Sequence, residues 1–207
     1  ICDKNLDLEY YYFFNAKIAG IEVIISRTGY TGELGYELYF TGDEQSAKSI
    51  WEAIFNAGKE FDIQPIGLAA RDSLRLEMGF CLYGNEINDE TSPIEAGLGW
   101  ITKFTDNKDF IDKEFLLKQK EEGVSKRLKG FVMIDRGIPR QHYEVVNAAG
   151  EIIGEVTSGT MSPMMKQGIG MAYLEKNYWK PDTDIYIRIR NKDLKAKIVN
   201  LPIYNKL

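Results

Sequence analysis

Histidine is nearly absent from this chain. Its 207 residues include a single one, His142, at the start of an expected strand and without a Ser or Cys nucleophile motif beside it. A Ser–His or Cys–His catalytic arrangement is therefore not indicated, and a surface or turn role is the better interpretation. No cluster of His, Cys or carboxylate residues has the spacing of metal ligands either. We expect no metal site.

Cysteine, long apolar runs and clustered positive charge are also scarce. Cys2 and Cys81 stand far apart with no redox spacing, which argues against a disulfide framework and favours a reducing compartment. No apolar run approaches a membrane span, and no signal peptide opens the chain. The net charge is −5 and Lys and Arg are dispersed, so nucleic-acid binding is not expected. Binding of a small anionic ligand by a single Arg remains an open alternative.

A glycine-rich stretch at residues 26–38 is the most distinctive part of what is present. Gly29, Gly32 and Gly35 recur at every third position between two apolar segments, and glycine lets the backbone approach a ligand closely. The stretch has neither a Gly-Lys-Ser/Thr ending nor a GxGxxG fingerprint, so phosphate cradling is not favoured. Its Arg, Glu and Tyr side chains exceed the needs of a plain turn. We therefore predict a binding site here.

The first half of the chain predicts antiparallel strands and helices. A hairpin is expected to turn near Ala19-Gly20. Asp43 is the predicted N-cap of one helix, and a second helix follows Pro65. The expected elements are strands at 8–14, 21–26 and 36–40 and helices at 43–58, 65–79 and 110–120.

Beyond residue 123 the pattern changes to short strands separated by turn residues. The expected strands are 128–134, 143–146, 151–157, 168–173, 184–189 and 194–199. Six short strands at this spacing suggest a small antiparallel barrel or sandwich. The predicted fold class is therefore α+β, with a region of helices and antiparallel strands over residues 1–123 and a small domain over residues 124–207.

Candidate ligand contacts come from the glycine-rich stretch and from the second helix. The rings of Tyr30 and Tyr36 suit stacking on a flat heterocycle, and the Glu37 carboxylate suits paired N–H donors. Arg71 suits a ligand carboxylate. Arg71 and Arg75 lie one helical turn apart and repel each other unless an anion or carboxylate lies between them. A solvated charged face, or an ion pair between Glu37 and Arg71, would explain the same residues.

Several motifs carry a resemblance to a known family. Besides residues 26–37, they are Gly-Leu-Ala-Ala-Arg-Asp-Ser-Leu-Arg-Leu-Glu-Met-Gly at 67–79, Leu-Tyr-Gly-Asn-Glu at 82–86, Pro-Ile-Glu-Ala-Gly-Leu-Gly-Trp at 93–100 and Gly-Ile-Gly-Met-Ala-Tyr at 168–173. Gly154, Ser158-Gly159, Ser162-Pro163 and Leu201-Pro202 extend the pattern. In this order the motifs resemble the glycine cleavage system T proteins, a family of tetrahydrofolate-dependent aminomethyltransferases.

The resemblance implies an activity and a set of site residues. Such an enzyme transfers the one-carbon unit of an aminomethyl group from the lipoyl arm of the carrier H protein to tetrahydrofolate, with release of ammonia. By motif, Tyr30 and Glu37 resemble folate-site residues, with Glu37 facing the pterin ring. Arg71 resembles the Arg of the folate and active-site region. Arg75 is a lesser candidate, because packing or an ion pair would account for it equally.

The resemblance also implies a difference from full-length members. Those have a long segment before the position of Ile1, and their principal catalytic carboxylate lies there. We therefore expect a C-terminal portion, with the end of the folate-binding region at 1–123, a β-barrel at 124–207 and no catalytic residue. Asn205 and Lys206 stand where the family has its last basic residues near the active site, and no role is carried over to them.

The expected partners are tetrahydrofolate, as the one-carbon acceptor, and the lipoylated H protein, without metal, nucleic acid or membrane. One alternative is the folate-binding domain of a dimethylglycine or sarcosine dehydrogenase, or of a tRNA-modification or iron–sulfur assembly factor. A second alternative is a non-catalytic folate-binding or docking module. The expected compartment is the cytoplasm for a bacterial source and the mitochondrial matrix for a eukaryotic one.

Overall fold

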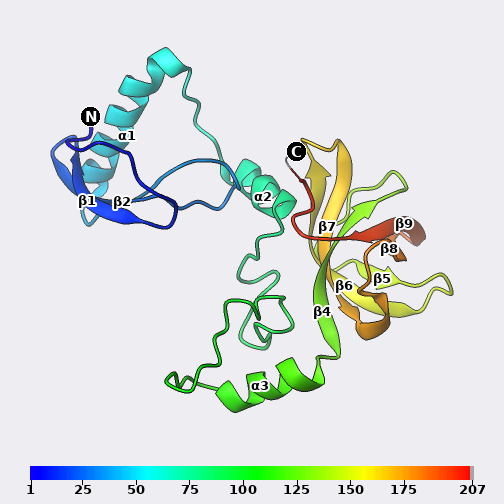
Figure 1. Cartoon of the computed structure of the whole chain (residues 1–207). Coiled ribbons are helices and arrows are strands. Elements are labelled where there is room, and N and C mark those ends of the chain that lie inside the picture. The colour runs from blue at the N-terminus through cyan, green and yellow to red at the C-terminus, as the bar shows by residue number, and fades with distance from the viewer. Residues whose placement is uncertain (206–207) are drawn as a thin grey trace. The chain divides into compact units, whose positions relative to one another are not determined.

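A computed structural model describes residues 1–205 (Figure 1). The chain forms two compact units, Ile1–Arg71 and Asp72–Leu207. Helix α2 (Leu68–Glu77) spans the point where one unit gives way to the other. Lys206, for which no role is predicted, lies outside the described residues.

A three-stranded antiparallel sheet forms the base of the first unit. It consists of β1 (Phe13–Ile18), β2 (Ile21–Ser26) and β3 (Glu37–Tyr39), in that order. Ala19 and Gly20 join β1 to β2 with φ angles of 51° and 80°, the left-handed conformation that a tight hairpin turn requires. The predicted hairpin is confirmed, and the glycine-rich stretch connects β2 to β3.

The first strand does not lie where the sequence analysis placed it. The strand predicted at 8–14 begins only at Phe13. Tyr11 has a φ of 70°, which interrupts extended backbone, and the rings of Tyr10, Tyr11 and Tyr12 are exposed. Aromatic residues favour strands only where their side chains pack on a sheet. Here the strand is set instead by the alternation that buries Ala16 and Ile18.

Helix α1 (Glu44–Gly58) covers this sheet with one apolar stripe, as predicted. It begins where the Asp43 Oδ1 atom accepts a hydrogen bond of 2.9 Å from the Ser46 backbone N–H. Ile50 is buried and Ile54 is partly buried against the sheet. A 3₁₀ turn, η1 (Lys59–Phe61), follows the helix. The small core comprises Ala16, Ile18, Val23, Ile25 and Ile50.

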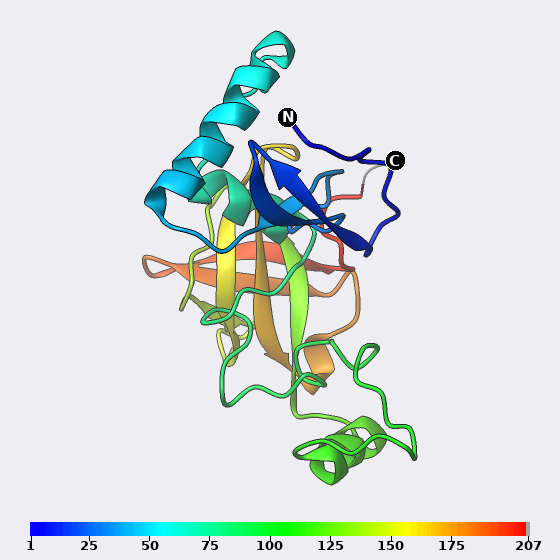
Figure 2. The ribbon, with the colours of Figure 1, turned by 90° about the vertical axis from the view of Figure 1, so that its left-hand side faces the viewer.

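The second unit contains a closed antiparallel barrel, which runs from green to red in Figures 1 and 2. Its strands within residues 72–205 are β4 (Lys126–Met133), β5 (Glu144–Val146), β6 (Ile152–Ser162), β7 (Gln167–Glu175), β8 (Asp184–Ile189) and β9 (Lys192–Val199). Their order is β4-β7-β6-β5-β8-β9, and pairing of β4 with β9 closes the ring. The six predicted strands and the α+β class are confirmed.

The barrel interior is filled by side chains. Phe131, Val145, Leu174, Ile185 and Ile187 are fully buried in it. Several glycines of the barrel leave no room for a Cβ atom, among them Gly154 in β6 and Gly170 in β7. A Cβ on Gly154 would lie 2.1 Å from the Tyr173 carbonyl oxygen, and one on Gly170 would lie 2.4 Å from the Phe131 ring. Glycine is therefore required where these strands pass close to their neighbours.

Helix α3 (Lys113–Glu122) precedes the barrel, and a 3₁₀ turn, η2 (Lys176–Tyr178), follows β7. The predicted domain boundary at 123/124 lies between α3 and β4, while the compact units divide at 71/72. The boundary stays a prediction. None of the helices in the described part of the chain has the length and hydropathy of a bilayer-crossing segment.

Candidate functional site

A small pocket of about 220 Å³ lies on the glycine-rich connection in the first unit. It brings together Tyr30, Glu37 and Arg71, the three residues predicted for a ligand site. Its lining residues are Thr28, Gly29, Tyr30, Thr31, Glu33, Gly35, Tyr36, Glu37 and Arg71. Residues more than thirty positions apart in the sequence therefore converge on one cavity.

Two arginines lie against the tyrosine rings of this connection. The Arg71 guanidinium carbon is 4.4 Å from the centroid of the Tyr30 ring, and that of Arg27 is 4.6 Å from the Tyr36 ring. Both separations fall within the range of cation–π contacts. The Tyr36 hydroxyl donates to the Leu6 carbonyl oxygen at 2.6 Å. These contacts hold the rings and positive charges in place around the pocket.

Glu37 is oriented by its neighbours on the sheet. Its Oε2 atom accepts hydrogen bonds from the Thr28 hydroxyl and, at 3.1 Å, from the Tyr39 hydroxyl. The bond to Glu37 raises the pKa of Tyr39 above its usual value, because loss of the phenol proton would place two negative charges side by side. Within residues 1–205, no hydrogen bond engages Oε1 of Glu37. The two bonds described for the Glu37 carboxylate therefore fall on one oxygen.

The Thr28 hydroxyl has a second acceptor within reach, the Ser26 Oγ atom at 2.9 Å. A hydroxyl has one proton to donate. Rotation of the Thr28 hydroxyl toward Ser26 would therefore free part of Glu37 Oε2 as well. Thr28 was missed by the sequence analysis, although its position beside the first glycine of the stretch was a usable signal.

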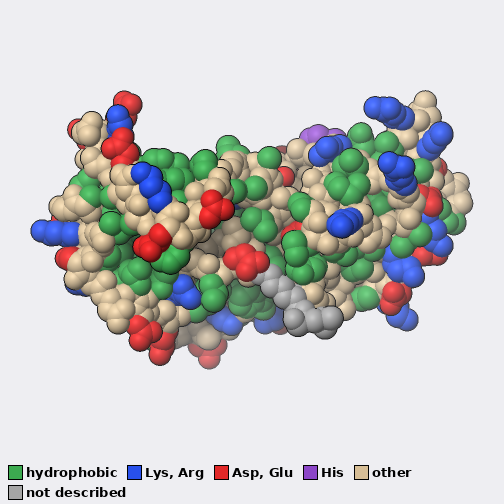
Figure 3. Space-filling model, turned by 90° about the horizontal axis from the view of Figure 1, so that it is seen from above, with side chains coloured by type: hydrophobic (Ala, Val, Ile, Leu, Met, Phe, Trp, Pro, Cys, Tyr) green, Lys and Arg blue, Asp and Glu red, His purple; other side chains and the backbone are tan. Residues whose placement is uncertain are grey.

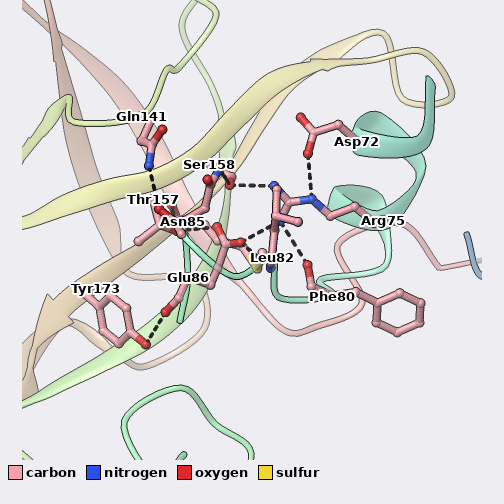
Figure 4. Close-up of polar contacts among 12 residues, drawn as sticks. Asp72, Arg75, Phe80, Leu82, Asn85, Glu86, Gln141, Thr157, Ser158 and Tyr173 are labelled. Carbon is pink, nitrogen blue, oxygen red and sulfur yellow. Dashed lines mark hydrogen bonds and ion pairs between the residues drawn. The ribbon is translucent and has the colours of Figure 1, made fainter. Parts of the chain in front are cut away.

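The alternative of an ion pair between Glu37 and Arg71 is not supported, since none is found among residues 1–205. Arg75 is the residue that forms one. Its side chain is fully buried and lies 2.7 Å from the Glu86 Oε2 atom (Figure 4). Arg71 is exposed by comparison. The Glu86 carboxylate therefore offsets the repulsion expected between Arg71 and Arg75 along the helix.

Arg75 is the centre of a buried polar cluster in the second unit (Figure 4). It donates to the Asp72 carboxylate at 2.8 Å and to the Ser158 hydroxyl at 2.7 Å. The other oxygen of Glu86 accepts a bond of 2.7 Å from the Thr157 hydroxyl. A buried ion pair is stable only when further hydrogen bonds complete both partners. This cluster meets that condition, which favours a structural role.

A β-bulge brings two consecutive barrel residues to this cluster. Val156 pairs with Ala172 and Ser158 pairs with Met171, so Thr157 has no partner of its own. In a regular strand, neighbouring side chains point to opposite faces. The extra residue of the bulge interrupts that alternation. The hydroxyls of Thr157 and Ser158 therefore both reach the Arg75–Glu86 pair.

Two further groups near the cluster have shifted pKa values. Burial, followed by the nearby Glu86 charge, raises the pKa of the Cys81 thiol to about 11. The Tyr173 hydroxyl donates to the Glu86 carbonyl oxygen at 2.8 Å. Burial, with smaller effects from surrounding negative groups, raises the pKa of Tyr173 well above its usual value. Both groups are therefore neutral near pH 7.

His142 lies on the barrel surface, as predicted. Its Nδ1 atom is 2.9 Å from the Glu155 Oε1 atom, and 74% of its side chain is exposed. Figure 3 shows this histidine in purple on the outside of the molecule. In the part of the chain that the structure describes, no group of three His, Cys, Asp or Glu side chains is arranged to hold a metal ion.

Comparison with family profiles divides the chain into two matched segments. Residues 2–106 match the profile described as "GCVT N-terminal domain". Residues 126–205, which contain the barrel, match "Glycine cleavage T-protein C-terminal barrel domain".

Curated relatives and a solved structure are similar over almost the whole chain. A protein named aminomethyltransferase from Bacteroides thetaiotaomicron is 60% identical over 196 residues, covering 94% of this chain and 54% of the relative. One of the same name from Flavobacterium psychrophilum is 56% identical, covering 97% and 55%.

The crystal structure of glycine cleavage system aminomethyltransferase T from Bartonella henselae superposes with a TM-score of 0.87 at 28% identity. The superposition covers 97% of this chain and 54% of the Bartonella henselae chain. The chain thus spans about half the length of the proteins it matches. The two profiles, these relatives and the shared barrel lead to one conclusion: the chain belongs to the glycine cleavage T-protein family.

Proposed function

We propose that the chain acts within an aminomethyltransferase that transfers a one-carbon unit from an aminomethyl-lipoyl carrier to tetrahydrofolate, with release of ammonia. The observation that carries this proposal is the pocket that joins Tyr30, Glu37 and Arg71 in a chain of this family. The relatives named aminomethyltransferase support it over a dehydrogenase-type module. A non-catalytic docking module has no specific observation in its favour.

The pocket suits one ring system. Its volume of about 220 Å³ is below the roughly 300–1,000 Å³ of pockets that enclose a whole drug-sized ligand. A pterin ring carries a ring amide N–H beside an exocyclic amine. Glu37 is the acceptor for these donors, first through Oε1 and then through Oε2 once the Thr28 hydroxyl has turned to Ser26. The rings of Tyr30 and Tyr36 supply stacking surface.

Arg71 supplies the positive charge of the site. Its guanidinium group lies over the Tyr30 ring, and a guanidinium in that position still presents N–H donors along its edge. Folate carries carboxylates on its glutamate tail, and Arg binds carboxylates with paired hydrogen bonds. We assign Arg71 to this part of the ligand or to negative charge that develops near the reacting carbon.

The reaction joins the transferred carbon to two folate nitrogens and breaks its bonds to the lipoyl sulfur and to the amine nitrogen. The sulfur is left as a thiol and the amine leaves as ammonia. The residues described here hold the acceptor for this exchange. Positioning of reactants is worth large effective molarities, roughly 10⁵–10⁸ M in well-oriented systems. We also propose the lipoylated H protein as donor, and the cytoplasm as compartment for a bacterial source.

Titration of the chain with tetrahydrofolate under reducing conditions tests the site. We expect Glu37→Gln and Glu37→Ala to weaken binding about tenfold or more, since hydrogen bonds to a charged group contribute roughly 1.5–3 kcal/mol. Calorimetry measures the dissociation constants. Glu22→Gln is the matched control, because this exposed carboxylate lies in the same sheet and pairs with Lys17. Unchanged affinity in Glu37→Ala would refute the assignment.

A further inference from the structure

A second pocket, of about 580 Å³, lies within the Asp72–Leu207 unit. It is built from the loop at 94–105, from the end of α3 and from the start of β4. Three aromatic residues line it, Trp100, Phe104 and Trp179. Its volume falls in the roughly 300–1,000 Å³ range of ligand pockets. None of its residues belongs to the pocket around Glu37.

The charges that line this pocket are all positive. Lys103, Lys120 and Arg127 contribute to its wall, and no Asp or Glu does. This is unusual in a chain with 31 acidic residues and a net charge of −5. Across residues 1–205, none of the three cations forms an ion pair with a carboxylate. The pocket wall therefore carries three positive charges without a carboxylate in contact among the described residues.

The cations are held against the walls of the pocket. The Lys120 Nζ atom lies 4.9 Å from the centroid of the Phe104 ring, and the Arg127 guanidinium carbon lies 6.0 Å from the Trp179 ring. The Lys103 ammonium group donates to the Trp100 carbonyl oxygen at 2.7 Å. Each ammonium or guanidinium group has further N–H donors to offer. Trp100 is 71% exposed, so its side chain is accessible to a ligand.

We infer that this pocket binds an organic anion with a planar ring and at least two negative charges. The rings of Trp100 and Trp179 stack on the planar group. The negative groups bind Lys103, Lys120 and Arg127 through charge-assisted hydrogen bonds. This site goes beyond the proposed function, which rests on other residues.

The probe for this site is benzene-1,3,5-tricarboxylate, added to the whole 207-residue chain labelled with 5-fluorotryptophan. The chain has three tryptophans, so fluorine NMR resolves three signals. We expect saturable shifts of the Trp100 and Trp179 signals. Trp51, which stacks on Phe55 in the first unit, serves as the internal control and should not move. Absence of any shift at Trp100 and Trp179 at millimolar probe would overturn the inference.

Charge and ring shape are tested separately. The double variant Lys120→Met/Arg127→Met should weaken binding about tenfold or more, and added salt should weaken it further. Lys118→Met/Arg136→Met removes the same charge from residues that do not line the pocket and should bind as the parent does. Equal affinities for the two double variants would contradict the charge assignment.

The ring requirement is tested with cyclohexane-1,3,5-tricarboxylate, which carries the same charges without a planar ring. We expect its affinity to be lower by about fivefold or more, because a base–aromatic type of stack contributes roughly 1–3 kcal/mol. Equal affinities for the two probes would show that the site does not require a planar ring. The Trp100 and Trp179 signals of each variant without probe, compared with those of the parent chain, show whether the second unit keeps its fold, and Trp51 reports on the first unit.

Discussion

Glu86 and Glu37 have the same side chain, but their surroundings suit one to a structural role and the other to ligand binding. Glu86 is 1% exposed, and both of its oxygens are engaged by Arg75, Thr157 and the Leu82 backbone N–H. Glu37 is only partly buried, and the bonds described for it fall on one oxygen. A buried carboxylate that already accepts three hydrogen bonds has little left for a ligand. Glu37 therefore remains the better ligand acceptor.

The raised pKa of Cys81 predicts an unreactive thiol. Only the thiolate is alkylated, and with a pKa of about 11 roughly one thiol in a thousand is ionised at pH 8. We expect iodoacetamide to modify native Cys81 about two hundredfold more slowly than the same thiol in urea, where a pKa near 8.5 applies. Since the pKa is raised, the native rate should climb as the pH approaches 11. Mass spectrometry of the Cys81 peptide measures the rates.

Fast modification of native Cys81 at pH 8 would contradict this prediction. The urea-unfolded chain provides the reference rate for the same residue, so differences between peptides do not enter. An inert Cys81 would fit its position beside the buried Arg75–Glu86 pair.

At the scale of elements, the second unit is joined by polar contacts as well as by its apolar core. The end of α2, the loop at 80–86 and the bulge of β6 meet at the Arg75–Glu86 pair. Nearby, Glu77 at the last position of α2 accepts hydrogen bonds from the Ser162 hydroxyl and the Met164 backbone N–H. Buried groups of this kind are costly to leave unpaired, so each element depends on the others.

Loss of Arg75 should therefore destabilise the protein strongly. We expect Arg75→Met to lower the free energy of unfolding by about 3–5 kcal/mol, because it leaves the Glu86 carboxylate buried without its cation. The double variant Arg75→Met/Glu86→Leu should lose less than the sum of the two single variants. Urea denaturation followed by circular dichroism measures each value.

The exposed pair of Lys118 and Glu122 on α3 provides the control, with its charged atoms 4.0 Å apart. Lys118→Ala should change stability by less than about 1 kcal/mol. A loss in Arg75→Met no larger than in this control would show that the buried cluster contributes little.

At the scale of the whole molecule, the chain contains two compact units and about half the length of its relatives. The folate pocket proposed here lies in the first unit, and the barrel and the cationic pocket lie in the second. In the proposed function, the residues of the first pocket supply the hydrogen-bond acceptor, the stacking rings and the positive charge that would bind and orient a ligand. That the catalytic carboxylate lies before the position of Ile1 stays an expectation from the resemblance.

We accordingly predict that the 207 residues alone bind tetrahydrofolate weakly and do not catalyse the transfer. The assay mixes the chain with aminomethylated H protein and tetrahydrofolate and measures methylenetetrahydrofolate. The full-length relative from Bacteroides thetaiotaomicron, which is 60% identical, serves as the positive control. Methylenetetrahydrofolate formed by the isolated chain at a comparable rate would refute the prediction.

The sequence by itself determined the features that depend on local patterns. Turn residues between short segments located six barrel strands, and Asp43 located the start of α1, because turn and capping preferences depend on near neighbours. The motif order indicated the family. It also selected Tyr30, Glu37 and Arg71, which the fold brings to one pocket, and their role in folate binding stays a prediction.

Tertiary structure decided what depends on distant partners. The sequence preferred Arg71 over Arg75 as a ligand contact but left the role of Arg75 open. Arg75 is buried because Glu86 and Ser158, from other elements, complete its hydrogen bonds. The bulge at Thr157 shifts the register of β6 against β7, and no residue pattern predicted it. The cationic pocket joins residues from 94 to 179, and no local pattern links them. The burial of a side chain and its hydrogen-bond partners depend on how distant elements pack together, so only the tertiary structure determines them.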